Sequence, residues 1–196
     1  MNVPGTDAAP VIAQQLNSGE RLVWSGRPRG GIRFREADIF VIPFSLVWCG
    51  FAIFWEIMAS RPVAAGRGGP WNVAFAFPLF GVPFVLIGLY FVFGRFITDA
   101  RKRAKTYYGI TDERIIIVNQ FLGQRIRSLN LRTLADVTLS ERGDGSGSIT
   151  FGPLQPYGQW AASWPGARQY ASPSFDFIDN AKQVYDTIRR GQRSAS

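Results

Sequence analysis

The chain has 196 residues, of which 46% are hydrophobic and 18% are charged, and its formal net charge at pH 7 is +8. It contains no histidine and one cysteine, Cys49. This composition excludes Ser-His-Asp and Cys-His catalysis, zinc sites built on histidine or on paired cysteines, and an internal disulfide. The mean hydropathy is close to zero, which is typical of a soluble domain, but the charges are distributed unevenly along the chain.

The first 38 residues precede the apolar part of the chain. Residues 1–15 are predicted to be a flexible terminus. Residues 16–38 contain five arginines and are predicted to be a cytoplasmic segment. Because the C-terminal part of the chain is expected on the same side of a membrane, residues 16–30 are predicted to pack against it.

Two long apolar runs follow. No charged side chain occurs in residues 39–55 or 68–94, and neither run has a polar stripe at helical spacing. A helix of about 20 residues crosses a hydrocarbon core of about 30 Å. We therefore predict a transmembrane hairpin over residues 39–97, with spans at about 39–59 and 71–93. A buried hairpin in a soluble protein is disfavoured, because the rest of the chain is too short to surround two wholly apolar helices.

Lysine and arginine are concentrated at one end of the predicted hairpin. Residues 21–38 and 94–111 each contain five of them, whereas the connecting loop contains only Arg61 and Arg67. The positive-inside rule then places both termini in the cytoplasm and the short loop outside. This bias explains most of the net charge, and no basic face interleaved with aromatic residues indicates nucleic-acid binding.

One acidic residue, Glu56, lies near the outer end of the first span. An acid in a membrane helix can mark a proton relay or an ion site. A side chain held among the lipid headgroups is the favoured interpretation, because Glu56 lies far from the middle of the span. A subunit of an oligomeric transporter or channel is the more distant alternative, since two spans and one acid do not form a pathway alone.

Residues 101–190 are predicted to form a separate cytoplasmic domain of short strands followed by one amphipathic helix. Tight turns are expected at Thr111–Glu113 and at Gly143–Gly147. The predicted strands are residues 106–110, 114–119, 125–131, 135–140 and 148–151, with one or two more within 153–174. The predicted helix, residues 179–190, places Ala181, Val184, Tyr185 and Ile188 on one face. The expected fold is α+β, a small antiparallel β-barrel or sandwich capped by a C-terminal helix, with residues 191–196 as a tail.

Four pieces of the sequence resemble bacterial membrane proteins in which a pleckstrin-homology-like (PH-like) domain adjoins a transmembrane hairpin. They are the Gly19–Pro28 opening, the Tyr108–Ile117 hairpin, the strands within Leu129–Phe151 and the closing segment Phe175–Ile188. The resemblance implies a PH-like fold for residues 101–190 and a location in a bacterial inner membrane. It also implies self-association, because similar modules form rings.

No residue pattern supports an enzyme. Gly143–Gly147 lacks the lysine of a phosphate-binding loop and precedes a predicted strand rather than a helix. Asp112 and Glu113 are neighbours in a turn, so their carboxylates do not converge as a catalytic pair must. No base is available to activate a serine. We therefore expect a non-enzymatic protein with no cofactor, metal ion, small-molecule substrate or nucleic-acid ligand.

Two groups of residues are candidates for binding. The basic residues that leave the second span could contact anionic headgroups at about 1 kcal/mol each, although ordinary positive-inside anchors have the same composition; they are Arg101, Lys102, Arg103 and Lys105. An aromatic, proline-rich stretch is a candidate protein-partner surface, with Tyr157, Trp160, Trp164, Arg168 and Tyr170. The expected function is a protein-interaction, scaffold or assembly module with a protein partner or a second copy of the chain. An anionic-lipid-binding envelope or membrane-stress component is the alternative.

Overall fold

The computed structural model describes residues 7–31, 38–65, 73–153 and 172–195. The chain divides into two compact units. One, here called the hairpin, is Ile32–Asp99. The other, here called the β domain, combines Met1–Gly31 with Ala100–Ser196. In sequence, the hairpin is thus an insertion into the β domain.

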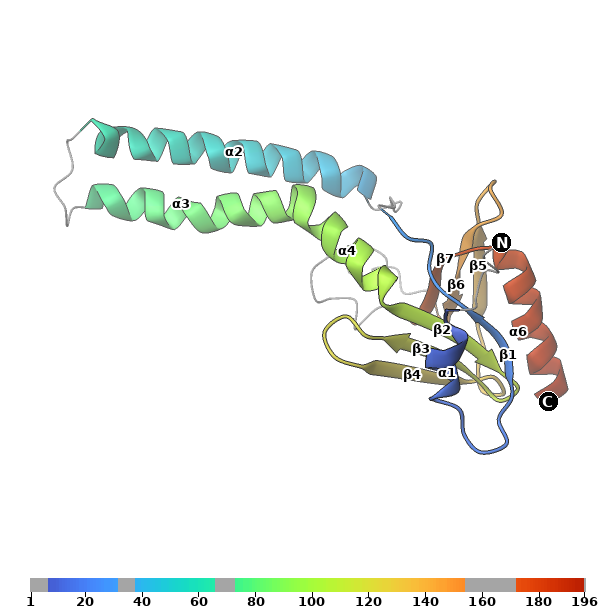
Figure 1. Cartoon of the computed structure of the whole chain (residues 1–196). Coiled ribbons are helices and arrows are strands. Elements are labelled where there is room, and N and C mark those ends of the chain that lie inside the picture. The colour runs from blue at the N-terminus through green and yellow to red at the C-terminus, as the bar shows by residue number, and fades with distance from the viewer. Residues whose placement is uncertain (1–6, 32–37, 66–72, 154–171, 196) are drawn as a thin grey trace. The chain divides into compact units, whose positions relative to one another are not determined.

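The hairpin consists of two long helices that run side by side in opposite directions (Figure 1). Helix α2 is Asp38–Ala64 and helix α3 is Val73–Leu89. Helix α3 continues through a π-helical turn, η1 (Tyr90–Gly94), into α4 (Arg95–Ala104). Helical structure therefore covers the described part of both predicted spans and extends beyond the apolar run into the basic segment.

The first sheet of the β domain is a four-stranded antiparallel sheet in the order β1-β2-β3-β4. Strand β1 comes from before the hairpin and pairs with β2, which comes after it. The predicted packing of residues 16–30 against the domain is thus confirmed at β1 by strand pairing. The four strands are Leu22–Gly26, Thr106–Thr111, Arg114–Asn119 and Arg125–Asn130.

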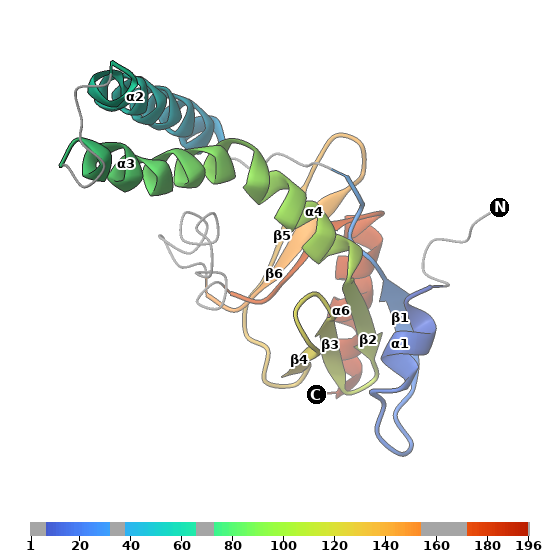
Figure 2. The same cartoon turned by 60° about the vertical axis from the view of Figure 1, so that its left-hand side comes forward.

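The second sheet has three antiparallel strands in the order β5-β6-β7. They are Val137–Glu141, Gly147–Phe151 and Ser174–Ile178. The C-terminal helix α6, Ala181–Ala195, packs on β5 and β6. A short helix α1, Ala9–Ala13, lies against the first sheet (Figure 2). Its Ile12 is buried above Gly109, so this part of the terminus predicted to be flexible forms an ordered element.

One hydrophobic core joins the two sheets and α6. The ring of Phe175 stacks on Tyr108 at a centroid distance of 4.4 Å and meets Phe151 edge-on at 5.0 Å. Val184 and Ile188 of α6 are buried in the same cluster. The predicted combination of antiparallel sheets and a C-terminal helix is confirmed. Among the described residues no strand pair connects the two sheets, so closure into a barrel is not observed.

Candidate membrane hairpin and binding surfaces

The two helices of the hairpin meet through small residues and expose large ones. Ser45, Cys49 and Ala52 of α2 are buried, as are Gly81 and Gly88 of α3. A Cβ at Gly88 would lie 3.0 Å from the Cα of Cys49, so the two backbones are in close contact. This arrangement is typical of helices packed in lipid, where small residues permit close approach and apolar side chains face outward.

The outward faces of both helices carry large apolar side chains. Phe40 is 78% exposed and Leu79 is 75% exposed. Both helices are long and apolar enough to cross a bilayer, and most of each is not covered by other parts of the structure. Because water would disfavour such a surface and hydrocarbon would not, the hairpin is a candidate membrane anchor.

A buried ion pair joins α2 to α4 at one end of the hairpin. An Nη of Arg95, at the start of α4, lies 3.0 Å from a carboxylate oxygen of Asp38, in the first turn of α2. Both side chains are 9% exposed, and the Arg95 guanidinium also lies over the ring of Phe96. Two buried charges are stable only as a pair, so this contact fixes which residues of α2 and α4 stand opposite each other.

Glu56, which is expected to lie among the headgroups, also contacts the second helix of the hairpin. Its carboxylate lies against Gly81 of α3, and its Oε2 atom is buried without a hydrogen-bond partner among the residues described. The glycine leaves room for the carboxylate, and a Cβ there would displace the end of the Glu56 side chain. Glu56 is therefore part of the contact between α2 and α3, which the sequence alone did not indicate.

In the β domain, the Gly19–Glu20 motif is held by a buried ion pair. The Glu20 carboxylate is fully buried and accepts hydrogen bonds from Nε and Nη2 of Arg114, each at 2.8 Å. It also accepts from the Thr111 hydroxyl at 2.7 Å and from the backbone N–H of Asn17 at 2.8 Å. Hydrogen bonds from Arg114 above all, opposed by burial, lower the pKa of Glu20 to about 2. The Gly19–Pro28 opening of the chain is thus bound to the β2–β3 hairpin through Glu20.

The chain that leaves β1 is held by Arg29. Its guanidinium pairs with Asp179 and, at 2.6 Å, with Asp144 of the β5–β6 turn. Hydrogen bonds from the hydroxyl and backbone N–H of Ser146, with a further contribution from Arg29, lower the pKa of Asp144 to about 2. The Gly143–Gly147 segment is therefore a hairpin turn that receives an arginine, in agreement with the prediction of a plain turn.

The four basic residues that follow the second apolar run are not equivalent. Arg101 and Lys105 are exposed and Lys102 is half-buried. Arg103 is 4% exposed; its Nη2 donates to the Gly31 carbonyl at 2.8 Å and its guanidinium lies over the ring of Phe177. The expected headgroup contact for Arg103 is thus wrong in this structure, because its charge is used inside the β domain. The other three remain candidates.

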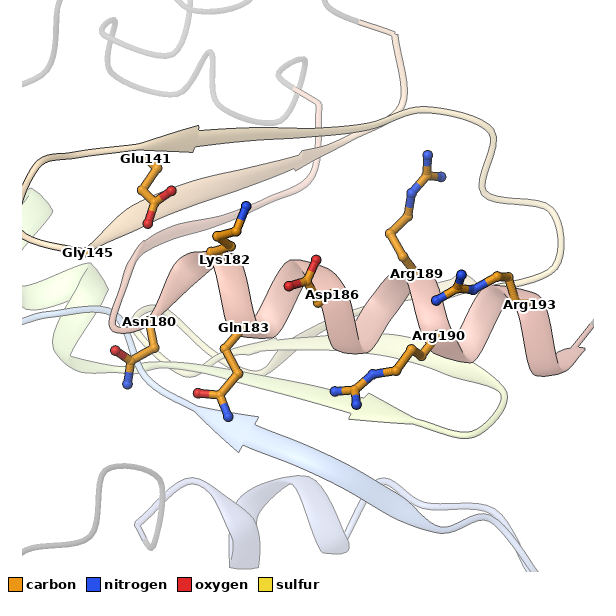
Figure 3. A pocket seen from close by; sticks show the side chains of 9 residues that line it. All are labelled: Glu141, Gly145, Asn180, Lys182, Gln183, Asp186, Arg189, Arg190 and Arg193. Atoms are coloured by element: carbon orange, nitrogen blue, oxygen red, sulfur yellow. The ribbon is translucent and has the colours of Figure 1, made fainter.

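A shallow pocket of about 570 Å³ lies along α6, and its lining is mostly charged. Figure 3 shows side chains projecting to both sides of the helix, with Lys182 and Arg189 on one side and Gln183 and Arg190 on the other. Arg193 extends the basic surface toward the end of α6, and the lining also includes two acidic residues, Glu141 of β5 and Asp186 of α6. This surface was not predicted from the sequence, although residues 182–193 contain one lysine and three arginines.

The expected partner surface cannot be placed within the structure, since Tyr157, Trp160, Trp164, Arg168 and Tyr170 lie outside the described residues. Within the described ranges, no group of three or more Asp, Glu or Cys side chains is arranged to hold a metal ion. Comparison of the chain with protein-family models, with curated proteins and with solved structures gave no match.

Proposed function

We propose that this protein is a non-enzymatic integral membrane protein that acts as a scaffold or assembly module. Its hairpin crosses a bacterial inner membrane twice, and both termini lie in the cytoplasm. The β domain is PH-like and binds a protein partner or a second copy of the chain. The outward apolar faces of α2 and α3 support the anchor, and the order of seven described strands followed by α6 supports the fold assignment.

The basic face of α6 is the observation that carries the partner-binding role. Val184 and Ile188 are buried in the core, so the opposite face of the same helix is presented to solvent. That face carries Arg189, Arg190 and Arg193, all exposed. Arginine is enriched at protein interfaces, and three of them along one helix fit an acidic protein surface.

The decisive experiment is crosslinking followed by mass spectrometry in native membranes. The double variant Arg190→Glu/Arg193→Glu should reduce partner crosslinks about tenfold, because like charges then face the acidic partner. The matched control is Arg21→Glu/Arg132→Glu, which makes the same charge change at two exposed positions. Equal crosslinking by the two double variants would show that the α6 surface is not the binding site.

The aromatic stretch provides an independent arm of the same experiment. Trp160→Ala and Trp164→Ala should each weaken partner crosslinking if the predicted aromatic surface contributes anchors. If neither does while the α6 variant does, the partner binds α6 alone. If both arms leave crosslinking unchanged, the scaffold role loses its support.

Binding of anionic lipid is the second candidate function, favoured by the exposure of Arg101 and Lys105. The chain has three lysines, Lys102, Lys105 and Lys182, so acetylation footprinting gives a direct test. In nanodiscs with anionic lipid, Lys102 and Lys105 should react more slowly than in zwitterionic nanodiscs, and added salt should restore their reactivity. Lys182, on α6, is the internal control, and equal behaviour of all three lysines would contradict lipid contact.

A further inference from the structure

Both connections between the first sheet and the hairpin leave from the same end of the sheet. In an antiparallel sheet, successive connections alternate between the two ends. Gly26 pairs with Tyr108, and Thr106 pairs with Asn119, so the end of β1 and the start of β2 lie at one end of the sheet. Asn119 pairs with Arg125, which places the β3–β4 turn at this same end. We call it the hairpin end of the sheet.

The β3–β4 turn, Gln120–Gln124, is fastened to the chain that arrives from α4. The backbone N–H of Gln120 donates to the Lys105 carbonyl at 2.9 Å. The Asn119 side chain donates to the Thr106 hydroxyl at 2.8 Å, and that hydroxyl donates to the Lys102 carbonyl at 2.7 Å. The turn is therefore held by hydrogen bonds beside the last turn of α4.

Among the described residues of the β domain, this turn carries the most exposed large apolar side chain. Leu122 is 84% exposed, and the left-handed conformation of Gly123 (φ 93°) reverses the chain directly after it. The neighbouring Phe121 lies with its ring centroid 5.8 Å from Nζ of Lys102. Because the turn is fixed by hydrogen bonds, the exposure of Leu122 is a feature of the fold.

Exposed basic side chains stand next to this apolar tip. Lys105 is exposed at the junction of α4 and β2, and Arg125 is exposed at the first position of β4. An apolar tip with basic neighbours matches the two layers of an anionic membrane surface, because the side chain enters the acyl boundary while the cations remain among the headgroups. Less than three helical turns separate Lys102 from Gly94, the last residue of the apolar run.

We propose that the β3–β4 turn is a membrane-contact finger, with Leu122 inserted into the interface of the bilayer that the hairpin spans and with Lys105 and Arg125 bound to anionic headgroups. The inference rests on the proposed membrane location of the hairpin. It goes beyond that location by assigning a second, separate attachment of the β domain to the same lipid surface.

The test uses the full chain in nanodiscs that contain anionic lipid, with Cys49 replaced by alanine and one environment-sensitive probe attached at an introduced cysteine. A probe at Gln124→Cys leaves Leu122 in place. Leu86→Cys, on the lipid-facing side of α3, reports the membrane location. Glu113→Cys, in the β2–β3 turn at the opposite end of the sheet, reports water.

Lipids that carry a quencher should reduce the emission at positions 86 and 124 but not at 113. Leu122→Asn should remove the quenching at 124 and leave that at 86 unchanged. Replacing the anionic lipid by a zwitterionic one should weaken the quenching at 124 alone. Quenching at 86 with emission at 124 equal to that at 113 would overturn the finger while the anchor stands. Absence of quenching at 86 would overturn the membrane location and the finger with it.

Discussion

At the scale of single residues, the β domain depends on charges that are buried in pairs. The Glu20 carboxylate accepts four hydrogen bonds, of which two come from Arg114, and it is fully buried. Removal of one member of such a pair leaves the other charge uncompensated, which costs about 3 kcal/mol or more. The pair joins the segment before the hairpin to strands that follow it, so it stabilises a contact that is distant in sequence.

This pair predicts a defined dependence of stability on pH. The pKa of Glu20 is about 2 in the folded protein against an ordinary value of 4.5. A lowered pKa means that the ionised form stabilises the fold, and the contribution is complete above about pH 4.5 and is lost as the pH falls toward about 2. Glu20→Gln should therefore lower the free energy of unfolding by about 3 kcal/mol at pH 7.

Thermal unfolding of the detergent-solubilised full chain, with hydrogen exchange of β2 and β3, measures the effect. The difference between the natural protein and Glu20→Gln should shrink as the pH is lowered from about 4.5. Glu113→Gln is the matched control, because it removes an exposed carboxylate two residues from Thr111. A difference that stays constant down to pH 3 would show that the ionised Glu20 does not stabilise the fold.

At the scale of elements, the hairpin is defined by the contact between Cys49 and Gly88. A Cβ built at Gly88 lies 3.0 Å from the Cβ of Cys49, and a disulfide needs about 3.5 to 4.5 Å between these atoms. The variant Gly88→Cys should thus form an intramolecular disulfide with the native cysteine after a small shift of the helices. The bond should appear as a loss of thiol reactivity on mild oxidation.

The control for this crosslink is Leu86→Cys, two residues away on α3 and facing outward. It should keep both thiols reactive or form only dimers between chains. If Gly88→Cys behaves in the same way as this control, the helices do not meet at these positions, and the small residues of α2 do not form the contact.

The elements of the β domain could largely be predicted from the sequence, because their signals are local. Alternation identified β4, the neighbouring tight turn identified β3, and the helical spacing of Val184 and Ile188 identified α6. The positions of Arg103 and Glu56 could not be predicted, since their partners, Gly31 and Gly81, are distant in sequence. Helix α1 was missed for the same reason: five residues have little helical propensity of their own, and burial of Ile12 on Gly109 stabilises them.

At the scale of the whole molecule, the pairing of β1 with β2 constrains the topology without reference to charge. The two strands belong to one sheet, yet β1 precedes the hairpin and β2 follows it. Both must lie on the same side of any membrane that the hairpin enters, so the chain between them crosses an even number of times. Two apolar helices satisfy this condition. The basic flanks then decide which side the β domain occupies.

The last prediction concerns the orientation of the hairpin in the membrane. Thiol labelling in intact cells tests it, in a variant in which Cys49 is replaced by alanine. Gly68→Cys, in the connecting loop, should react with a membrane-impermeant maleimide added outside. Ser194→Cys, at the end of α6, should react only after the membrane is permeabilised. Labelling of position 194 alone in intact cells would reverse the orientation and contradict the charge argument. Labelling of both positions would place the connecting loop and α6 on the same side, so α3 would not cross the membrane and the two-span topology would be wrong.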